Sequence, residues 1–142
     1  MVLIRTWLKG MKSDPSKQSS VPLHQTISGV LDHDLATLKT FFTFAPDFVT
    51  REFQLRTGDK AVLVYLEGLI DKSAINNNIL YPLMYELETI NDIWNSSITI
   101  ARTEIITLWT DIEKAIFQGK SILIIEGQKR SLIIDTQGWP QR

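Results

Sequence analysis

Four carboxylates stand where sheet proteins often place reacting groups. Glu67, Asp71, Glu126 and Asp135 all lie at or near the ends of predicted strands, and sites in sheet proteins frequently gather there. Two such carboxylates in one cleft could act as a general acid and a general base. Each of the four also has an ordinary role as a helix cap or a turn residue, and no catalytic constellation occurs elsewhere. The sequence therefore predicts that the protein is not an enzyme.

Metal and phosphate sites are not indicated either. The chain has no cysteine and two histidines, His24 and His33, so a zinc site would also need carboxylates. His33 lies between Asp32 and Asp34, but adjacent helical residues point in different directions, and we interpret this stretch as a solvated helix start. The loop 68–71 has one glycine and an acidic cap that would repel phosphate. We expect no metal and no cofactor.

Amide and indole side chains are the remaining groups that could recognise a ligand. Asn76, Asn77 and Asn78 stand together inside a predicted helix, although asparagine is a mediocre helix former. A solvated helix face explains them, and a polar recognition surface is the alternative. Trp94 and Trp109 occur at the edges of predicted elements, and we expect both to be buried against the sheet.

The composition limits the class of protein. The 142 residues suffice for one domain with a real core, and 44% hydrophobic with 22% charged residues is typical of globular proteins. The net charge of −1, from 15 basic and 16 acidic residues, argues against a nucleic-acid-binding surface. Uninterrupted apolar runs reach about six residues, far below the roughly 18 to 20 that span a bilayer.

Residues 1–25 are predicted to form a flexible tail, and residues 26–142 a single α/β subdomain. The stretch 13–22 is polar and rich in serine and proline, so it cannot bury enough apolar surface to offset the entropy of ordering it. The start of the chain is weakly basic and partly apolar. The alternative to a plain tail is a transient contact with a membrane surface through Leu3, Ile4, Trp7 and Leu8 with Arg5, Lys9 and Lys12.

The domain is expected to begin with a helix and a hairpin. Apolar residues from Ile27 to Phe42 recur at steps of three and four, which is the spacing of one helical face. Residues 48–56 then alternate with period two, and residues 61–66 are apolar throughout. This pattern predicts two paired strands, of which the second is interior and covered on both faces.

A second helix should follow the first hairpin. Asp71 is a plausible N-cap, and Pro82 should kink or split the helix near Tyr81 because proline removes a backbone donor. Its buried stripe is predicted to contain Ile75, Ile79, Leu83, Leu87 and Ile90, widened by Leu80, Met84 and Tyr85.

The rest of the chain predicts a loop, a short strand, a third helix and a second hairpin. The loop is placed at 91–97 and the strand within 98–106. The third helix begins at a capping box formed by Thr110 and Glu113, with Thr107 as a competing start, and ends at Gly119. The second hairpin pairs residues 121–126 with residues 130–135.

Both hairpins are apolar and need cover on two faces, which only the helices can supply. We therefore predict an α/β (α+β mixed) fold, in which a central mixed β-sheet built from two β-hairpins is flanked by about three to four α-helices. The predicted core contains Leu35, Leu38, Phe53, Leu63, Tyr65, Ile79, Leu83, Leu87, Ile116, Leu123, Ile125, Leu132 and Ile134. The chain stops soon after the second hairpin without a natural surface ending, so we expect the native protein to continue.

Five segments in this order resemble the N-terminal soluble region of the A subunit of GerA-type spore germinant receptors. The resemblance covers residues 27–142. The matching segments are Asp47–Phe53, Ala61–Asp71, Ile79–Met84, Gly119–Gly127 and the final Gly138-Trp139-x-x-Arg142.

The resemblance implies the first soluble subdomain of a larger membrane subunit, followed by a second subdomain and membrane-spanning helices. Such a receptor lies in the spore inner membrane, responds to small nutrients and starts germination. Its A subunit acts with B and C type subunits, with self-association as a further option. The soluble region would lie on the cytoplasmic, spore-core side.

Two functions are compatible with this resemblance. No convergent polar pocket is evident, which favours subunit assembly and signal transmission. The alternative is a small-molecule, nutrient-binding sensor domain, with its pocket where residues 68–71 and 127–130 approach one another. The candidate ligand or partner contacts are Glu67, Gly68, Asp71, Asn76, Gly127, Gln128, Arg130 and Trp139.

Overall fold

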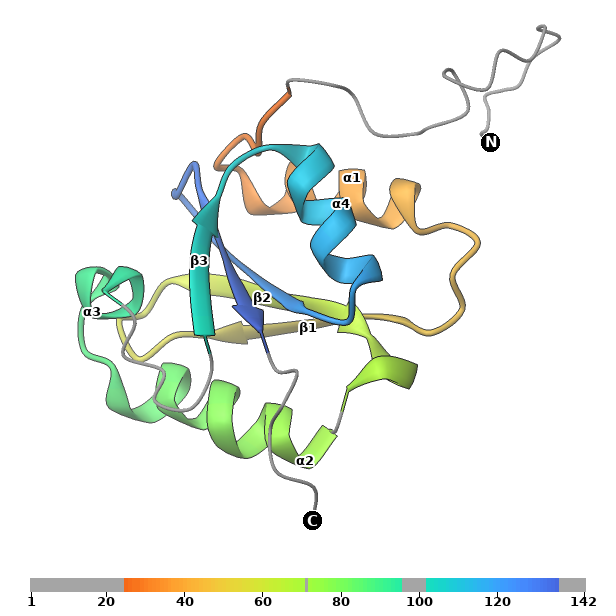
Figure 1. Cartoon of the computed structure of the whole chain (residues 1–142). Helices are drawn as coiled ribbons and strands as arrows, with labels where there is room; N and C mark the ends of the chain where they lie inside the picture. The colour runs from red at the N-terminus through yellow and green to blue at the C-terminus, as the bar shows by residue number, and fades with distance from the viewer. Residues whose placement is uncertain (1–24, 71, 96–101, 136–142) are drawn as a thin grey trace, which may run out of the picture.

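The computed structural model describes residues 25–70, 72–95 and 102–135. They form three layers, with one five-stranded sheet between two sets of helices (Figure 1). The predicted α+β class is confirmed, and both hairpins are present. The sheet has the order β1-β2-β4-β5-β3, with β1 at Phe48–Gln54, β2 at Lys60–Leu66, β3 at Arg102–Ile106, β4 at Ser121–Ile125 and β5 at Ser131–Asp135.

Helices cover both faces of this sheet. One face carries α1 (Leu31–Phe41) and α4 (Trp109–Phe117). The other face carries a continuous helical segment, which consists of α2 (Lys72–Ala74), η3 (Ile75–Leu80) and η4 (Pro82–Glu86). A short helix, α3 (Ile90–Trp94), follows it on the same face. A 3₁₀ turn, η2 (Glu67–Leu69), leads out of β2. Among the described residues, no helix is both long enough and apolar enough to cross a membrane.

All four strand pairings are antiparallel, so neighbouring strands alternate in direction and the sheet is not mixed as predicted. Each hairpin fixes the direction of its own two strands. The direction of β4 relative to β2 depends instead on the long connection between them. Because α4 runs back across the sheet before β4 begins (Figure 1), Ile122 at the start of β4 lies opposite Val64 near the end of β2.

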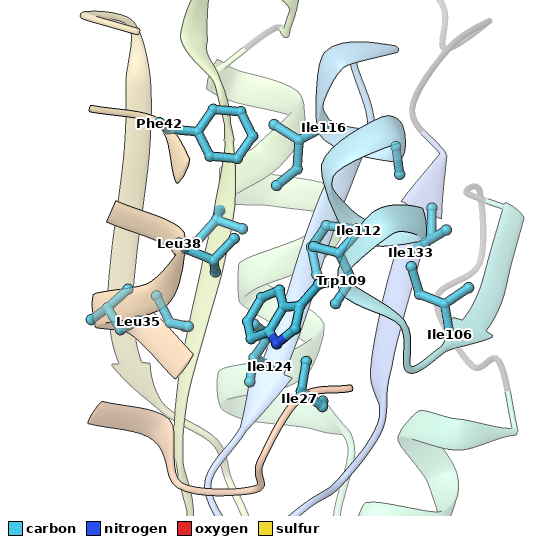
Figure 2. Close-up of a cluster of buried hydrophobic side chains, with 14 of the residues drawn as sticks. Ile27, Leu35, Leu38, Phe42, Ile106, Trp109, Ile112, Ile116, Ile124 and Ile133 are labelled. Atoms are coloured by element: carbon cyan, nitrogen blue, oxygen red, sulfur yellow. The ribbon is translucent and has the colours of Figure 1, made fainter. Parts of the chain in front are cut away.

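The core consists of two apolar clusters, one on each face of the sheet. On β2, Val62 and Val64 point to the α1 and α4 side, whereas Leu63 and Tyr65 point to the other side. Figure 2 shows the first cluster, where side chains of α1 and α4 face each other against the sheet. Every predicted core residue is buried except Phe53 and Leu87, which are half-buried at the margin of the second cluster.

The first helix starts later than predicted. α1 begins at Leu31 and not near Ile27. Ile27 is nevertheless buried, because its stretch of chain is extended and pairs with the start of α4: Thr26 bridges Leu108, and the Ile27 N–H donates to the Thr107 carbonyl at 3.1 Å. The apolar spacing at Ile27 therefore reflects burial of an extended segment and not a turn of helix.

The helical segment after β2 changes winding where proline was expected to disturb it. Two wide π-helical stretches, η3 and η4, meet at Tyr81 directly before Pro82. The predicted cap Asp71 lies outside the described residues. The loop predicted at 91–97 is wrong over its described part, because α3 occupies Ile90–Trp94. Thr89 and Asp92 form its capping box, in which aspartate takes the place usually held by glutamate.

The third predicted helix is present as α4, but its start is wrong. α4 begins at Trp109 with Leu108 as N-cap and has no side-chain cap, so neither Thr110 nor Thr107 has that role. The Trp109 N–H, at the first position of α4, donates to the Gln25 carbonyl at 3.0 Å. This bond satisfies one of the backbone donors that have no acceptor within the helix. The predicted end is confirmed, since Gly119 has a φ of +89° and bonds back to Ile116.

The central position of β2 gives a stability prediction. Leu63 is fully buried between β1 and β4, so Leu63→Ala should lower the free energy of unfolding by about 2–5 kcal/mol. Glu52→Ala, at an exposed position on the paired strand β1, should change it by less than about 0.5 kcal/mol. Urea denaturation measures both, and a loss below about 1 kcal/mol for Leu63→Ala would contradict an interior position.

Candidate functional site

Three connections meet at one end of the sheet, which we name the loop end: residues 42–47, 67–70 and 118–120. Phe48 pairs with Leu66, and the Glu67 N–H donates to the Asp47 carbonyl at 2.8 Å. The Glu67 carboxylate forms an ion pair with Lys72. The hydrogen bond between the Lys72 ammonium and the Glu67 carboxylate, together with the negative charge of Glu67, raises the pKa of Lys72. Gly68 is exposed beside the Asp47 carboxylate.

Two hairpin turns lie at the opposite end, which we name the turn end: residues 55–59 and 126–130. The Glu126 N–H donates to the Lys60 carbonyl at 2.9 Å, so the second hairpin turns where β2 begins. The seven residues of β2 separate this end from the loop end by roughly 20 Å. The prediction of a pocket between residues 68–71 and 127–130 is therefore wrong, because the described parts of those segments lie at opposite ends of the sheet.

The turn after β4 is fastened to the start of α1. The Glu126 carboxylate accepts the Leu31 N–H at 3.1 Å across 95 sequence positions, which caps α1 from another element. The Gly127 N–H donates to the Gly29 carbonyl at 2.8 Å. Gln128 is half-buried in the same turn. Two of the candidate contacts, Gly127 and Gln128, therefore belong to a structural junction.

Asp34 contributes a second fastening at the same place. Its carboxylate accepts the Ser28 N–H and hydroxyl, both at 2.9 Å, and the Gly29 N–H at 3.2 Å. Asp34 is fully buried, so the interpretation of this stretch as a solvated helix start is wrong for Asp34, while Asp32 and His33 are exposed. In the described segments, no three carboxylate or imidazole groups gather as a metal site would need.

Arg130 and Trp94 form a pair that the sequence did not link. The Arg130 guanidinium lies 4.4 Å from the centre of the Trp94 ring, a cation–π geometry. Trp94 is 7% exposed, and Trp109 is also buried, as predicted for both. The indole Nε1 of Trp94 has no hydrogen-bond partner among the described residues. A buried donor without a partner is uncommon, so this indole is a candidate ligand contact.

The outer face of the helical segment carries two exposed tyrosines. We name the surface formed by Tyr81, Tyr85, Asn76 and Asn77 the tyrosine face. Tyr81 and Tyr85 are 52% and 55% exposed, and their ring centres are 5.0 Å apart. Tyr85 was predicted in the buried stripe, which is wrong. Asn76 and Asn77 are exposed on the same segment. The missed signal was the four-residue spacing, which places two side chains together on a helix.

Comparison with known proteins decides the family. The sequence model of the Bacillus/Clostridium GerA spore germination protein family matches residues 36–142. The chain belongs to the GerA family. The chain is also similar to a crystal structure, that of the N-terminal domain of the A subunit of the Bacillus megaterium spore germinant receptor GerK3. The match has 25% identity and a TM-score of 0.67, and it covers 80% of this chain and 49% of that one.

Two curated proteins of Bacillus subtilis (strain 168) are also similar. Spore germination protein KA is 24% identical over 123 residues, and the uncharacterized membrane protein YfkQ is 23% identical over 120 residues. Each alignment covers 82% of this chain and 23% of the relative. The chain therefore spans about a quarter of the length of these relatives. The resemblance inferred from the five sequence segments is confirmed.

GerA membership links the chain to spore germination, and the GerA family is not a known enzyme family. Among the candidate contacts, Glu67 and Gly68 lie at the loop end, and Gly127, Gln128 and Arg130 lie at the turn end. Asn76 lies on the tyrosine face. Asp71 and Trp139 lie outside the described residues. The candidate contacts that the structure describes thus lie on three surfaces of the GerA domain and not in one cleft.

The buried Asp34 gives a second stability prediction. Asp34→Ala leaves the Ser28 and Gly29 donors without their acceptor. The free energy of unfolding should therefore fall by about 2–4 kcal/mol. Asp32→Ala, in the same helical turn but exposed, should cost less than about 1 kcal/mol. Thermal and urea unfolding of the two variants check this, and equal losses would show that the Asp34 contacts do not fasten α1.

Proposed function

We propose that this domain is the first N-terminal subdomain of a spore germinant receptor A subunit, where it serves in subunit assembly and signal transmission. The receptor lies in the spore inner membrane, and the domain lies on its cytoplasmic side. Its partners are the B and C type subunits. The GerA family match and the similarity to the GerK3 A subunit support the placement, and a relative named as a membrane protein supports the membrane location.

The tyrosine face is the observation that carries the assembly role. Tyr81 and Tyr85 are each more than half exposed and lie ring against ring. Tyrosine is enriched at the centres of protein interfaces, because its large ring makes contact with only two side-chain torsions to fix. The exposed amides of Asn76 and Asn77 add hydrogen-bonding groups beside the rings. The combination is typical of a surface that binds another protein.

The helical segment holds this face rigidly. On its inner side, Ile79 and Leu83 are fully buried against the sheet. At its end, Arg56 from the β1–β2 turn donates to the Tyr85 carbonyl at 2.6 Å, and the Arg56 N–H donates to the Leu83 carbonyl at 3.0 Å. A preordered surface loses little entropy on binding, which favours assembly with a partner.

The assembly role predicts a specific loss of partner subunits. Tyr81→Ser with Tyr85→Ser, in the full-length A subunit, should reduce the B and C type subunits that copurify with it by about tenfold or more, as expected for interface hot spots. Ile105→Ser serves as the control, because Ile105 is an exposed apolar residue on the edge strand β3. Quantitative immunoblots of purified receptor give the measurement, with spore germination rates as a second readout. Unchanged recovery of both subunits in the double variant would contradict this use of the tyrosine face.

A nutrient sensor is the second candidate, and the Trp94–Arg130 pair favours it. An indole N–H without a hydrogen-bond partner in the described segments and a guanidinium over the same ring are two donors that suit a carboxylate. Amino acids carry such a group, and sugars do not. Under this proposal the domain binds an amino acid at the turn end and passes the occupancy to the rest of the receptor.

Titration of the 142-residue chain with amino acids, followed by protein NMR, tests the sensor. Saturable shifts should centre on the Trp94 indole N–H and the 126–130 turn, with glucose as an uncharged comparison. Arg130→Gln should weaken binding by about tenfold or more, because a hydrogen bond to a charged group is lost. Lys129→Gln, which removes an exposed cation from the same turn, should leave it unchanged. Shifts that are absent, or spread evenly over the domain, would reject the sensor.

A further inference from the structure

Two of the most exposed aromatic side chains lie at the loop end. Phe44 is 83% exposed in the turn after α1, and Phe117 is 58% exposed at the last residue of α4. The buried Phe42 joins them structurally, because its ring lies 5.1 Å from that of Phe117 and the turn containing Phe44 follows it directly. Leu69, at 56% exposure, ends η2 at the same end. Exposed large apolar groups gathered at one place indicate a binding surface.

The charges around the two phenylalanines are mainly positive. Lys39 and Lys114 are exposed on the last turns of α1 and α4, and Lys120 follows α4. Two carboxylates at this end are Asp47, which is exposed, and Glu67, whose charge is paired with Lys72. Glu113 on α4 is half-buried, and this burial raises the pKa of its carboxyl. The helix C-termini also point here, and their partial negative charge is offset by these lysines.

We propose that the loop end is a membrane-contact surface, which rests on anionic lipid headgroups with Phe44 and Phe117 inserted at the interface. Aromatic side chains flanked by lysines are the chemistry that an anionic bilayer surface selects. Each lysine near such a surface strengthens binding by about fivefold. The three cations provide the charge complementarity, and the two rings provide the apolar contact. The proposal concerns a surface separate from the tyrosine face and from the Trp94–Arg130 pair, and it does not rest on either proposed function.

The geometry suits a surface contact in preference to a groove for a peptide. Phe44, in the turn after α1, and Phe117, the last residue of α4, stand at the ends of two helices that lie on the same face of the sheet (Figure 1). Neither ring belongs to the apolar cluster on this face, where Phe42 and Phe48 stack on each other with ring centres 4.5 Å apart. The exposed rings can therefore be replaced without opening the core.

Vesicle cosedimentation of the 142-residue chain tests the proposal. The chain should sediment with vesicles that contain phosphatidylglycerol and stay in solution with vesicles of phosphatidylcholine alone, and salt should weaken the binding. Phe44→Ser with Phe117→Ser should lower the partition coefficient by about tenfold. Lys39→Gln with Lys114→Gln should lower it by about 25-fold, at fivefold per lysine. This second variant keeps the test valid if the first one unfolds, and circular dichroism reports the fold of each.

Two control variants separate the loop end from other surfaces. Tyr81→Ser with Tyr85→Ser removes the distant aromatic pair, and Trp7→Ser with Leu8→Ser removes the apolar groups of the N-terminal segment. Both should sediment like the unchanged chain. The proposal is overturned if the chain ignores phosphatidylglycerol, if only the Trp7 and Leu8 variant loses binding, or if the loop-end variants bind vesicles normally. Loss of copurifying subunits by the loop-end variants, with vesicle binding unchanged, would assign this end to a protein partner and also overturn it.

Discussion

The pairing of β2 with β4 is the interaction on which the rest of this domain depends. The first hairpin contributes β2 and the second contributes β4, and in the described sheet the two hairpins are joined only through this pair, with Leu63 opposite Leu123. Both strands are buried along almost their whole length, so their side chains point into an apolar cluster on each face. A sheet with no polar face cannot be stable with helices on one side only. The two helical layers follow from this one pairing.

Local patterns in the sequence predicted the elements that local interactions determine. Both hairpins, the glycine that ends α4 and nearly all of the core follow from alternation, apolar runs and turn residues. Two of the errors lie where distant parts of the chain decide the outcome. α4 starts at Trp109 because its N–H bonds to Gln25, and α1 is capped by Glu126 across 95 positions. No window of neighbouring residues contains those contacts.

The candidate site was harder to predict than the fold for a related reason. Glu126 looked available at a strand end, but its carboxylate is engaged as the cap of α1. Arg130, four residues later, lies instead over Trp94, which belongs to a helix that the sequence did not predict. Polar residues at the ends of strands serve either the junctions of the fold or its ligands. Burial and hydrogen-bond partners distinguish these roles, and both are properties of the folded chain.

Rigid packing has a consequence for how this domain could pass on a signal. The helical segment carries the tyrosine face on its outer side and packs on the sheet with its inner side. Ile79 and Leu83 are fully buried on that inner side, whereas Tyr81 and Tyr85 are exposed. Lys72 pairs with Glu67 at the start of the segment, and Arg56 bonds to the Tyr85 carbonyl at its end. Close-packed interiors transmit displacement and do not absorb it. Under the proposed signalling role, a partner that displaced this segment would therefore act on the sheet packed beneath it.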